Sequence, residues 1–280
     1  MNLKSNDCLD LNELLNLNRE GIFPGPQESA DVFCRRIEKV RTGIAMPGPA
    51  LTEEEWEAAH QITKPLFDIQ PTWVPAFYGD KKLSFWEAAA VWDCDGRSVV
   101  QLRSRFAKGG RGSRGNQGAW RLVKQQEVLA HEAAHAARMA FRESRFEEMI
   151  CYQTSRLSWR RRFGPLFRHS WEAALCAGAA AISWILGFFG ALSLALIIPW
   201  IPFVFYLLRL IRDRALFQRC LKNIRPLLIT PDQALAVALR LTDPEILLFA
   251  RSSPAAIVAY IREQQGRQLR WQVIAAAYIA

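Results

Sequence analysis

The pattern of hydrophobic and polar positions in the first third of the chain predicts helices separated by turns. Residues 1–50 are mostly polar and carry proline–glycine turn signals, and within them 28–41 has the spacing of an amphipathic helix. Thr52 is followed three residues later by Glu55, which is a capping-box pattern. We therefore expect another helix to begin there, and an irregular connection over 69–85, where prolines and aromatic residues are mixed.

In the middle of the chain the pattern changes from strand-like to helical. The apolar runs 88–92 and 98–106 flank Asp95-Gly96, a pair typical of tight β-hairpin turns. The glycine- and arginine-rich stretch 108–118 cannot support a regular element, so we expect a loop there. Residues 122–141 contain neither proline nor glycine and are dominated by good helix formers, which predicts a helix.

A long apolar run predicts a membrane segment. No charged residue occurs over 173–208, and this length suits two short spans better than one. Residues 187–190 offer a glycine turn between the spans, and Pro199 and Pro202 would kink the second. Basic residues on both flanks predict a hairpin with both ends facing the cytoplasm. They are Arg160, Arg161, Arg162 and Arg168 before the run, and Arg209, Arg212 and Arg214 after it.

The chain after Ile224 has the polar punctuation of a soluble region and predicts three or four short packed helices. Thr230-Pro231, Asp243-Pro244 and Ser253-Pro254 each place a capping residue before a proline suited to the first helical position. The fold class expected from these patterns is mainly α with a small β-sheet.

The net charge and the cysteines indicate which partners and which cellular compartment the protein is expected to have. The net charge of +9 points to an anionic neighbour, either a lipid surface, nucleic acid or an acidic substrate. The 6 cysteines are scattered and form no CxxC pair, which argues for a reducing compartment and against a disulfide framework or a cysteine-based metal site. The first residues contain no apolar stretch, so no cleavable signal peptide is expected.

The motif that carries chemistry lies in the helix expected over 122–141. His131-Glu132-Ala133-Ala134-His135 is an HExxH pattern, and the spacing of four places both imidazoles on one helix face, where both can bind one zinc ion. Glu132 can then serve as the general base toward a metal-activated water. The alternative is a helix whose histidines are merely packed or solvated.

A third ligand is expected from the acidic pair Glu147 and Glu148. In one unbroken helix Glu148 would lie ~19 Å from His135, so the chain must turn between them. Ser144 and Glu147 have capping-box spacing, which predicts a second helix that occupies Glu147 and leaves Glu148 free to face the histidines.

An HExxH helix followed by a glutamate on the next helix resembles the gluzincins, the zincin peptidases that include thermolysin-like and membrane-embedded enzymes. In that group the ligand glutamate commonly has a small residue three positions later, and Cys151 holds that place relative to Glu148. Many gluzincins have an aspartate to orient a zinc-bound histidine where this chain has Tyr152. The ingredients are also similar to those of prenyl-protein and heat-shock membrane proteases, in a different order, and the resemblance covers 125–155.

The resemblance implies a Zn²⁺ cofactor and a cleft with further functional parts. The strand 98–106 precedes the motif helix where the group has its substrate-aligning edge strand, and an ordinary core strand is the alternative. Tyr152 and Arg156 are candidates to stabilise the oxyanion. His60 and His169 are expected to be ordinary surface or core histidines.

The domain arrangement that follows is a zincin-like catalytic domain over 1–160, with 1–50 as an extension, a transmembrane hairpin over 171–210 and a helical segment over 211–280. The function expected is a zinc metallopeptidase in a bacterial-type inner membrane, with its catalytic domain in the cytoplasm. Its partners would be the bilayer and a protein or peptide substrate.

Two other functions remain open at this point. One is a membrane-anchored interaction or scaffold protein with a degenerate metal site. The other is an anionic-lipid or nucleic-acid tether that works through the loop at 108–118, although nucleic acid is not the partner that the motif favours. A solvated loop is the plainer interpretation of that stretch, and it lacks the ending of a phosphate-binding P-loop.

Overall fold

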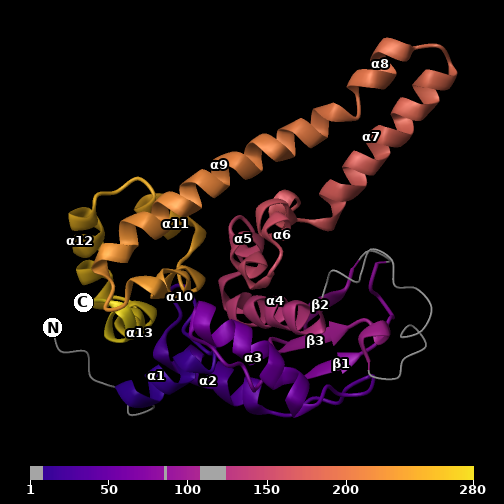
Figure 1. Cartoon of the computed structure of the whole chain (residues 1–280). Coiled ribbons are helices and arrows are strands. Elements are labelled where there is room, and N and C mark those ends of the chain that lie inside the picture. Colours follow the sequence, from indigo (N-terminus) through magenta and orange to yellow (C-terminus); the bar gives the residue numbers. More distant parts are fainter. Residues whose placement is uncertain (1–8, 85–86, 108–123) are drawn as a thin grey trace.

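The computed structural model describes residues 9–84, 87–107 and 124–280, which form a mainly helical protein with a three-stranded sheet (Figure 1). The predicted loop at 108–118 lies outside the described residues. The strands are β1 (Ala76–Tyr78), β2 (Ala89–Asp93) and β3 (Ser98–Leu102). The α-helices are α1 (Leu11–Arg19), α2 (Ala30–Arg41), α3 (Glu53–Phe67), α4 (Gln125–Arg138), α5 (Glu147–Cys151), α6 (Ser158–Phe163), α7 (Ser170–Phe188), α8 (Leu192–Ile197), α9 (Trp200–Ile224), α10 (Ala234–Leu239), α11 (Asp243–Phe249), α12 (Pro254–Gln265) and α13 (Leu269–Tyr278).

The N-terminal helices begin where local capping predicts. The side chain of Thr52 accepts a hydrogen bond from the backbone of Glu55, and Glu55 bonds back to the backbone of Thr52, so the predicted capping box starts α3. The helix expected over 28–41 is α2, and Ser29 is its N-cap.

The sheet has the order β1-β3-β2, with β1 parallel to β3 and β2 antiparallel to β3. The predicted hairpin is therefore present. Of the two interpretations of 98–106, the edge strand is wrong and the ordinary core strand is confirmed, over 98–102. β3 is the central strand because residues 76–78, within the stretch expected to be irregular, pair with it on the far side. Residues 104–106 form a short 3-10 helix. The exposed edge belongs to β2.

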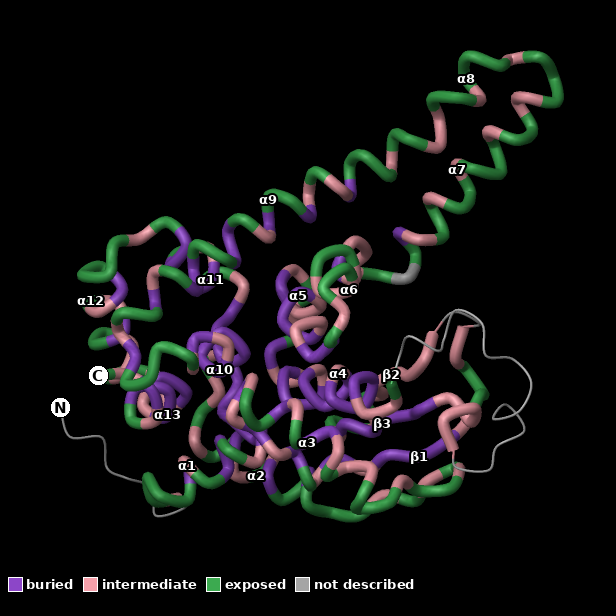
Figure 2. The backbone as a smooth tube through the Cα atoms, viewed as in Figure 1, coloured by how far each residue is buried: buried purple, intermediate pink, exposed green. Residues whose placement is uncertain are grey.

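Helix α4 packs across the sheet and also contacts α3 and α5. Its Leu129, Ala130 and Ala136 share a buried cluster with Val100 and Leu102 of β3. Small alanine side chains allow this close approach of helix and sheet. Figure 2 shows that α4 and β3 are among the most buried parts of the backbone. Of the predicted 122–141, the helix covers 125–138 and 139–141 continue as a 3-10 turn, while 122–123 lie outside the described residues.

Helices α7, α8 and α9 form a hairpin that projects from the rest of the protein (Figures 1 and 2). The predicted turn is present, and Gly190 adopts a positive φ of 82° that favours glycine. Ile198 and Pro199 divide the second apolar stretch into α8 and α9, and both keep helical backbone angles, so the chain bends where a kink at Pro199 was predicted (Figure 1). The helical stretches 171–188 and 192–227 are long and apolar enough to cross a membrane, and the most apolar 18-residue window of each is only 6% and 11% buried.

Helix α9 and the C-terminal helices share one large core with the motif helix. This core contains Ala134 of α4, Ile150 of α5, Phe217 of α9 and Trp271 of α13. The buried guanidinium of Arg138, at the end of α4, donates hydrogen bonds to the backbone oxygens that follow α10, at 2.6 and 3.0 Å. The C-terminal helices therefore support the end of the motif helix directly.

Two details of the C-terminal region differ from expectation. The cap of α11 is Thr242, which forms a capping box with Glu245, whereas Asp243 is the first residue of the helix. Thr230 makes no side-chain cap hydrogen bond, although Ser253 caps α12 as predicted.

The cysteine expectation is partly wrong. Cys34, on α2, is disulfide-bonded, whereas Cys94, Cys151, Cys176 and Cys220 are free. A disulfide removes the support that scattered cysteines gave to a reducing compartment.

Candidate metal centre

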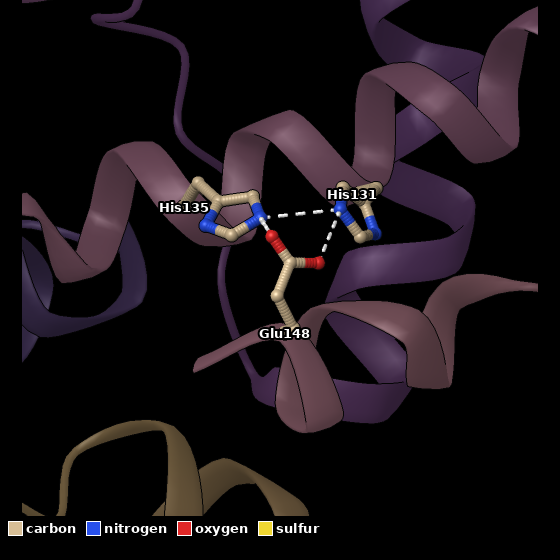
Figure 3. A group of neighbouring side chains, drawn as sticks. All are labelled: His131, His135 and Glu148. Carbon is tan, nitrogen blue, oxygen red and sulfur yellow. Dashed lines mark hydrogen bonds and ion pairs between the residues drawn. The ribbon is translucent and has the colours of Figure 1, made fainter. Parts of the chain in front are cut away.

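Helix α4 presents His131 and His135 on one face, one turn apart (Figure 3). Their Nε2 atoms lie 3.1 Å from each other, and the ring centroids are separated by 4.8 Å. This arrangement follows directly from the spacing of four residues in an α-helix. Both side chains are partly exposed to a cavity, while most of the surrounding helix is buried.

Helix α5 brings Glu148 to the two imidazoles. One carboxylate oxygen lies 3.5 Å from Nε2 of His131, and the other lies 3.4 Å from Nε2 of His135. One ligand atom from each of the three residues lies within 4.8 Å of the others. The structure thus brings together the three side chains that the sequence nominates for a metal site.

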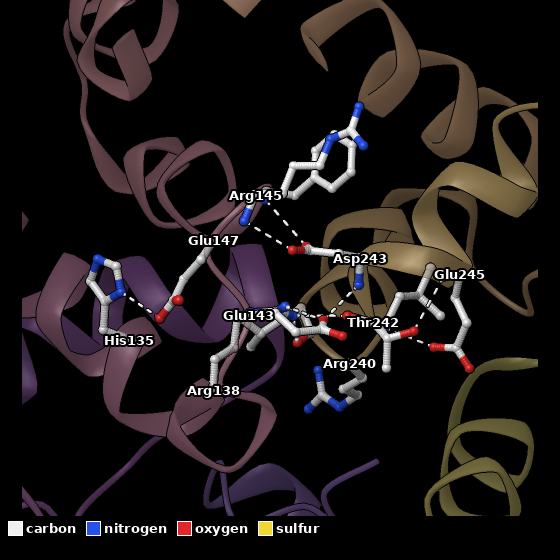
Figure 4. Close-up of polar contacts among 12 residues, drawn as sticks. His135, Arg138, Glu143, Arg145, Glu147, Arg240, Thr242, Asp243 and Glu245 are labelled. Carbon is white, nitrogen blue, oxygen red and sulfur yellow. Dashed lines mark hydrogen bonds and ion pairs between the residues drawn. The ribbon is translucent and has the colours of Figure 1, made fainter. Parts of the chain in front are cut away.

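A turn between α4 and α5 makes this convergence possible. Arg142 adopts the left-handed conformation, with φ 52°, and reverses the chain after the 3-10 turn. The carboxylate of Asp243 then accepts hydrogen bonds from the backbone N–H groups of Arg145 and Phe146, at 2.9 and 3.2 Å (Figure 4). The predicted capping box at Ser144 is wrong, since α5 begins at Glu147 without a side-chain cap of its own. The distant Asp243 supplies that function.

Glu147 therefore has a different role from the one expected. Its Oε1 lies 2.8 Å from Nδ1 of His135 (Figure 4). A carboxylate at Nδ1 accepts the N–H there, so a metal bound at Nε2 would meet a ring whose proton is held on Nδ1. The sequence argument assigned Glu147 to the helix end and missed this contact. The only sequence feature that could have indicated this contact is the position of Glu147, directly before the predicted ligand Glu148.

The local field keeps Glu148 ionised. Burial alone would raise the pKa of its carboxyl, but the charge of His135 and hydrogen bonds from both imidazoles lower that pKa well below its usual value. An ionised carboxylate beside two imidazole nitrogens is a donor set suited to a divalent cation.

Glu132 is buried beside the histidines, with 8% of its surface exposed, and it lines the same cavity. Burial raises the pKa of its carboxyl, although the neighbouring imidazoles partly oppose this. A carboxylate whose pKa moves toward neutrality becomes a better proton acceptor at physiological pH.

Tyr152 lies against His131, with ring centroids 4.6 Å apart in an edge-to-face arrangement. Burial, with the charge of Glu148, raises the pKa of its hydroxyl to about 12, so the phenol keeps its proton and can donate a hydrogen bond. Arg156, the other oxyanion candidate, is exposed and does not line the cavity. Arg160 lines it instead, and its guanidinium lies over the Tyr152 ring at 5.7 Å.

These groups line one cavity of about 730 Å³ that runs between α4, α5, α6 and strand β2. Residues 88–91, at the start of β2, line one side of the cavity, and Trp159 and Arg160 of α6 contribute to the lining as well. The sequence argument did not anticipate the strand or α6 at this place.

The remaining histidines lie elsewhere. His60 is buried on α3, stacked on Trp56, and His169 precedes α7 and stacks on Trp171. Neither belongs to the cluster of His131, His135 and Glu148.

The chain matches no protein-family model, no curated protein and no solved structure.

Proposed function

We propose that this protein is a membrane-anchored zinc metallopeptidase, with His131, His135 and Glu148 as the metal ligands and Glu132 as the general base. One observation carries the proposal. Two imidazole nitrogens and a carboxylate converge at the wall of a cavity of about 730 Å³, and a buried glutamate lines the same cavity. This is a mainly helical protein with a small sheet, which agrees with a zincin-like α+β domain without requiring one.

The spacing of the donor atoms suits zinc. Ligands bound at ~2.0–2.1 Å in a tetrahedral arrangement lie ~3.3–3.4 Å from one another. The contacts here are 3.1 Å between the two Nε2 atoms, and 3.5 and 3.4 Å from these atoms to different oxygens of the Glu148 carboxylate. With one oxygen as the ligand, the three donor atoms lie within 4.8 Å of one another, so a rotation of the carboxylate would bring them to the zinc spacing. Three protein ligands leave the fourth position of a tetrahedral site open, as catalytic zinc sites require.

The bound zinc would supply Lewis acidity, which polarises a carbonyl and makes water a better nucleophile near neutral pH. Glu132 accepts the proton of the attacking water and passes it to the leaving amine. Burial of Glu132 favours this proton transfer, because burial disfavours the ionised carboxylate and so raises the pKa of the group that has to accept the proton. Glu147 holds His135 in the tautomer that presents Nε2.

Strand β2 offers the place for an extended peptide. Ala88 O accepts a hydrogen bond from Arg103 N, so the antiparallel alternation directs the backbone groups of Ala89 and Val91 away from β3. Both residues line the cavity. Among the described residues β2 pairs only with β3, and a substrate strand could extend the sheet through main-chain hydrogen bonds. In this arrangement the tyrosine hydroxyl of Tyr152 would donate to the developing oxyanion.

Membrane anchoring is proposed through the helical hairpin. Trp184 is 86% exposed and Phe188 is 88% exposed, and a hairpin this apolar is poorly compatible with water. The arginines on both flanks favour a topology in which both ends of the hairpin lie on the cytoplasmic side, in a bacterial-type inner membrane. A substrate would then be a protein or peptide close to that surface.

The test is metal content followed by peptidase activity of the purified full-length protein in detergent. We expect close to one zinc per chain in the wild type and in Glu132→Gln, and almost none in His131→Ala with Glu148→Ala. Glu132→Gln should lose about 10²–10⁴-fold in hydrolysis of a fluorogenic peptide mixture, the range for a lost acid–base group. Substitution of the exposed Glu263 by Gln is the matched control.

Zinc content near zero in the wild type would reject the metal centre. Full zinc content with equal peptide hydrolysis in wild type and Glu132→Gln would reject the catalytic assignment and favour a scaffold protein with a structural metal.

A further inference from the structure

A second, smaller pocket of about 150 Å³ lies between α6 and α9, at the base of the hairpin, and it is lined by three arginines. No aspartate or glutamate is among its described lining residues. The residues that line it are Met149, Gln153, Ser158, Arg161, Arg162, Pro165, Leu210, Arg214 and Gln218.

The other arginines at this level have carboxylate partners. Arg145 lies 2.7 Å from Asp213, and Arg168 contacts the same carboxylate. Arg209 forms an ion pair with Glu172 at 2.6 Å. The two buried carboxylates at the foot of the hairpin, Asp213 and Glu172, are therefore already paired with other arginines. They do not form ion pairs with the three arginines of the pocket.

The arginines of the pocket are held in part by hydrogen bonds to the backbone, but no carboxylate neutralises their charge. The guanidinium of Arg161 donates hydrogen bonds to the backbone oxygens of Ser155 and Arg156, at 2.7 and 2.9 Å. Within the described part of the chain, no carboxylate forms an ion pair with Arg161, Arg162 or Arg214. Several like charges around a small polar pocket repel each other unless an anion binds among them.

With the hairpin inserted in a bilayer, as proposed above, the pocket would lie at the depth of the lipid phosphates. The apolar part of α9 ends at Arg209, and Arg214 follows five residues later, which is ~7.5 Å along the helix. A bilayer is ~30 Å thick in its hydrocarbon core and ~40–45 Å with its headgroups, so each headgroup layer is ~5–8 Å. The distance from Arg209 to Arg214 along the helix therefore matches the thickness of one headgroup layer.

Helix α6 carries independent signs of contact with an interface. Trp159 and Phe163 are one helical turn apart and are 54% and 55% exposed, although both are large aromatic residues. Aromatic side chains concentrate at membrane–water interfaces. They lie on the same short helix as Arg161 and Arg162, so this helix combines interfacial aromatic residues with phosphate-binding cations.

We propose that the pocket of Arg161, Arg162 and Arg214 binds a phosphate group, and that an anionic phospholipid headgroup supplies it. Arginine is well suited to this group, because its planar fork binds phosphate oxygens through two parallel hydrogen bonds. The proposal concerns the foot of the hairpin and does not depend on zinc or on peptide hydrolysis.

The experiment uses full-length protein in a neutral detergent, with native mass spectrometry to count retained lipid. Phosphatidylglycerol and phosphatidylcholine are added separately at equal concentrations, and inorganic phosphate is tested in a third arm by thermal unfolding. The variant is Arg162→Gln with Arg214→Gln. The matched control is Arg219→Gln with Arg225→Gln, which removes the same charge from exposed positions at α9 and its C-terminal end.

We expect one phosphatidylglycerol to be retained in preference to phosphatidylcholine, with binding about 30-fold weaker in the pocket variant, since each arginine near an anionic surface contributes about 1 kcal/mol. The control should bind as the wild type does. Equal retention of both lipids by the wild type would overturn the lipid assignment, and stabilisation by inorganic phosphate alone would then assign the pocket to a soluble phosphate. Equal binding by the pocket variant and the control would overturn the site itself. The lipid preference is measured on the wild type alone, so it tests the assignment to an anionic lipid even if the double variant fails to fold.

Discussion

Nδ1 of His135 lies 2.8 Å from the carboxylate of Glu147, while Nε2 of the same ring faces Glu148. Two consecutive glutamates thus hold the two nitrogens of one imidazole. The first fixes the orientation and proton position of the ring, and the second completes the candidate ligand set. This division of roles makes the two glutamates separable by experiment.

Glu147→Gln should weaken zinc binding by about 10–100-fold, the usual cost of losing an orienting partner of a ligand histidine. Glu148→Gln should abolish tight binding, because it removes a ligand. Competition with a fluorescent zinc chelator would measure both affinities. If Glu147→Gln and the exposed-site control Glu263→Gln bind zinc equally, the contact with His135 has no positioning role.

Asp243→Ala should destabilise the turn that precedes α5. The side chain accepts two backbone hydrogen bonds in that turn, and their loss should cost about 2 kcal/mol of unfolding free energy. Thermal unfolding in detergent would measure the loss, with Asp232→Ala, at an exposed aspartate, as the control. Zinc affinity should fall in the same variant. An unchanged zinc affinity would show that the turn holds Glu148 in place without this cap.

Gly164→Ala tests Tyr152 without touching a metal ligand. A Cβ at Gly164 would lie 2.5 Å from the tyrosine ring, so the ring must move from its place against His131. We expect peptide hydrolysis to fall by at least about tenfold, given the cost of displacing an oxyanion donor, while zinc content stays at the wild-type level. Gly43→Ala, where a Cβ meets nothing within 4 Å, is the control. Loss of zinc together with activity would place Tyr152 in support of the metal ligands instead.

Acid should destabilise the C-terminal helices through Glu245. Burial would raise the pKa of this carboxyl, but its ion pair with Arg270, at 2.6 Å, outweighs burial and lowers the pKa below the ordinary value of 4.5. The ion pair therefore stabilises the fold fully above pH 4.5, and this contribution is lost as the pH falls through the lowered value.

Glu245→Gln should accordingly be less stable than the wild type at pH 7, by about 3–5 kcal/mol, because it leaves a buried arginine unpaired. The difference between the two proteins should shrink as the pH is lowered. Unfolding midpoints across a pH series would measure this, with Glu263→Gln, at an exposed ion pair with Arg267, as the control. A difference that is constant with pH would rule out the ionised pair as its source.

Trp184→Arg with Phe188→Arg should release the protein from membranes. Both positions are exposed in the second half of α7, and an arginine in a membrane span costs up to about 2.5–3.5 kcal/mol, the value for the centre of the span. Carbonate extraction of membranes would measure the released fraction. Leu248→Arg, at an exposed apolar residue outside the hairpin, should remain in the membrane pellet. Retention of the double variant would mean that the hairpin does not anchor the chain.

Local patterns predicted the parts of this protein that depend on neighbouring residues. The capping box of Thr52 and Glu55, the face shared by His131 and His135, and the glycine turn at 187–190 all follow from periods and turn chemistry. These features were predicted correctly because the interactions that determine them span only a few residues.

The errors arose where distant segments decide the outcome. β3 is central only because 76–78 pair with it, and a strand of three residues leaves little periodicity to detect. The sequence argument placed Glu148 by a capping box at Ser144 that does not form, whereas Asp243 caps the turn from almost a hundred residues away. The geometry at Glu148 therefore agrees with a prediction whose stated reason was wrong.

The continuity of α9 has a mechanical consequence. The N-terminal half of this helix is mostly exposed, whereas its C-terminal half packs into the main core. The C-terminal half carries Asp213, which forms an ion pair with Arg145 in the turn before α5. With the exposed half in the lipid, as we propose, the helix would connect the bilayer rigidly to the segment that leads to Glu148. A change in bilayer thickness or lateral tension that tilts the exposed half would then displace that segment, and the proposed activity would depend on the physical state of the membrane.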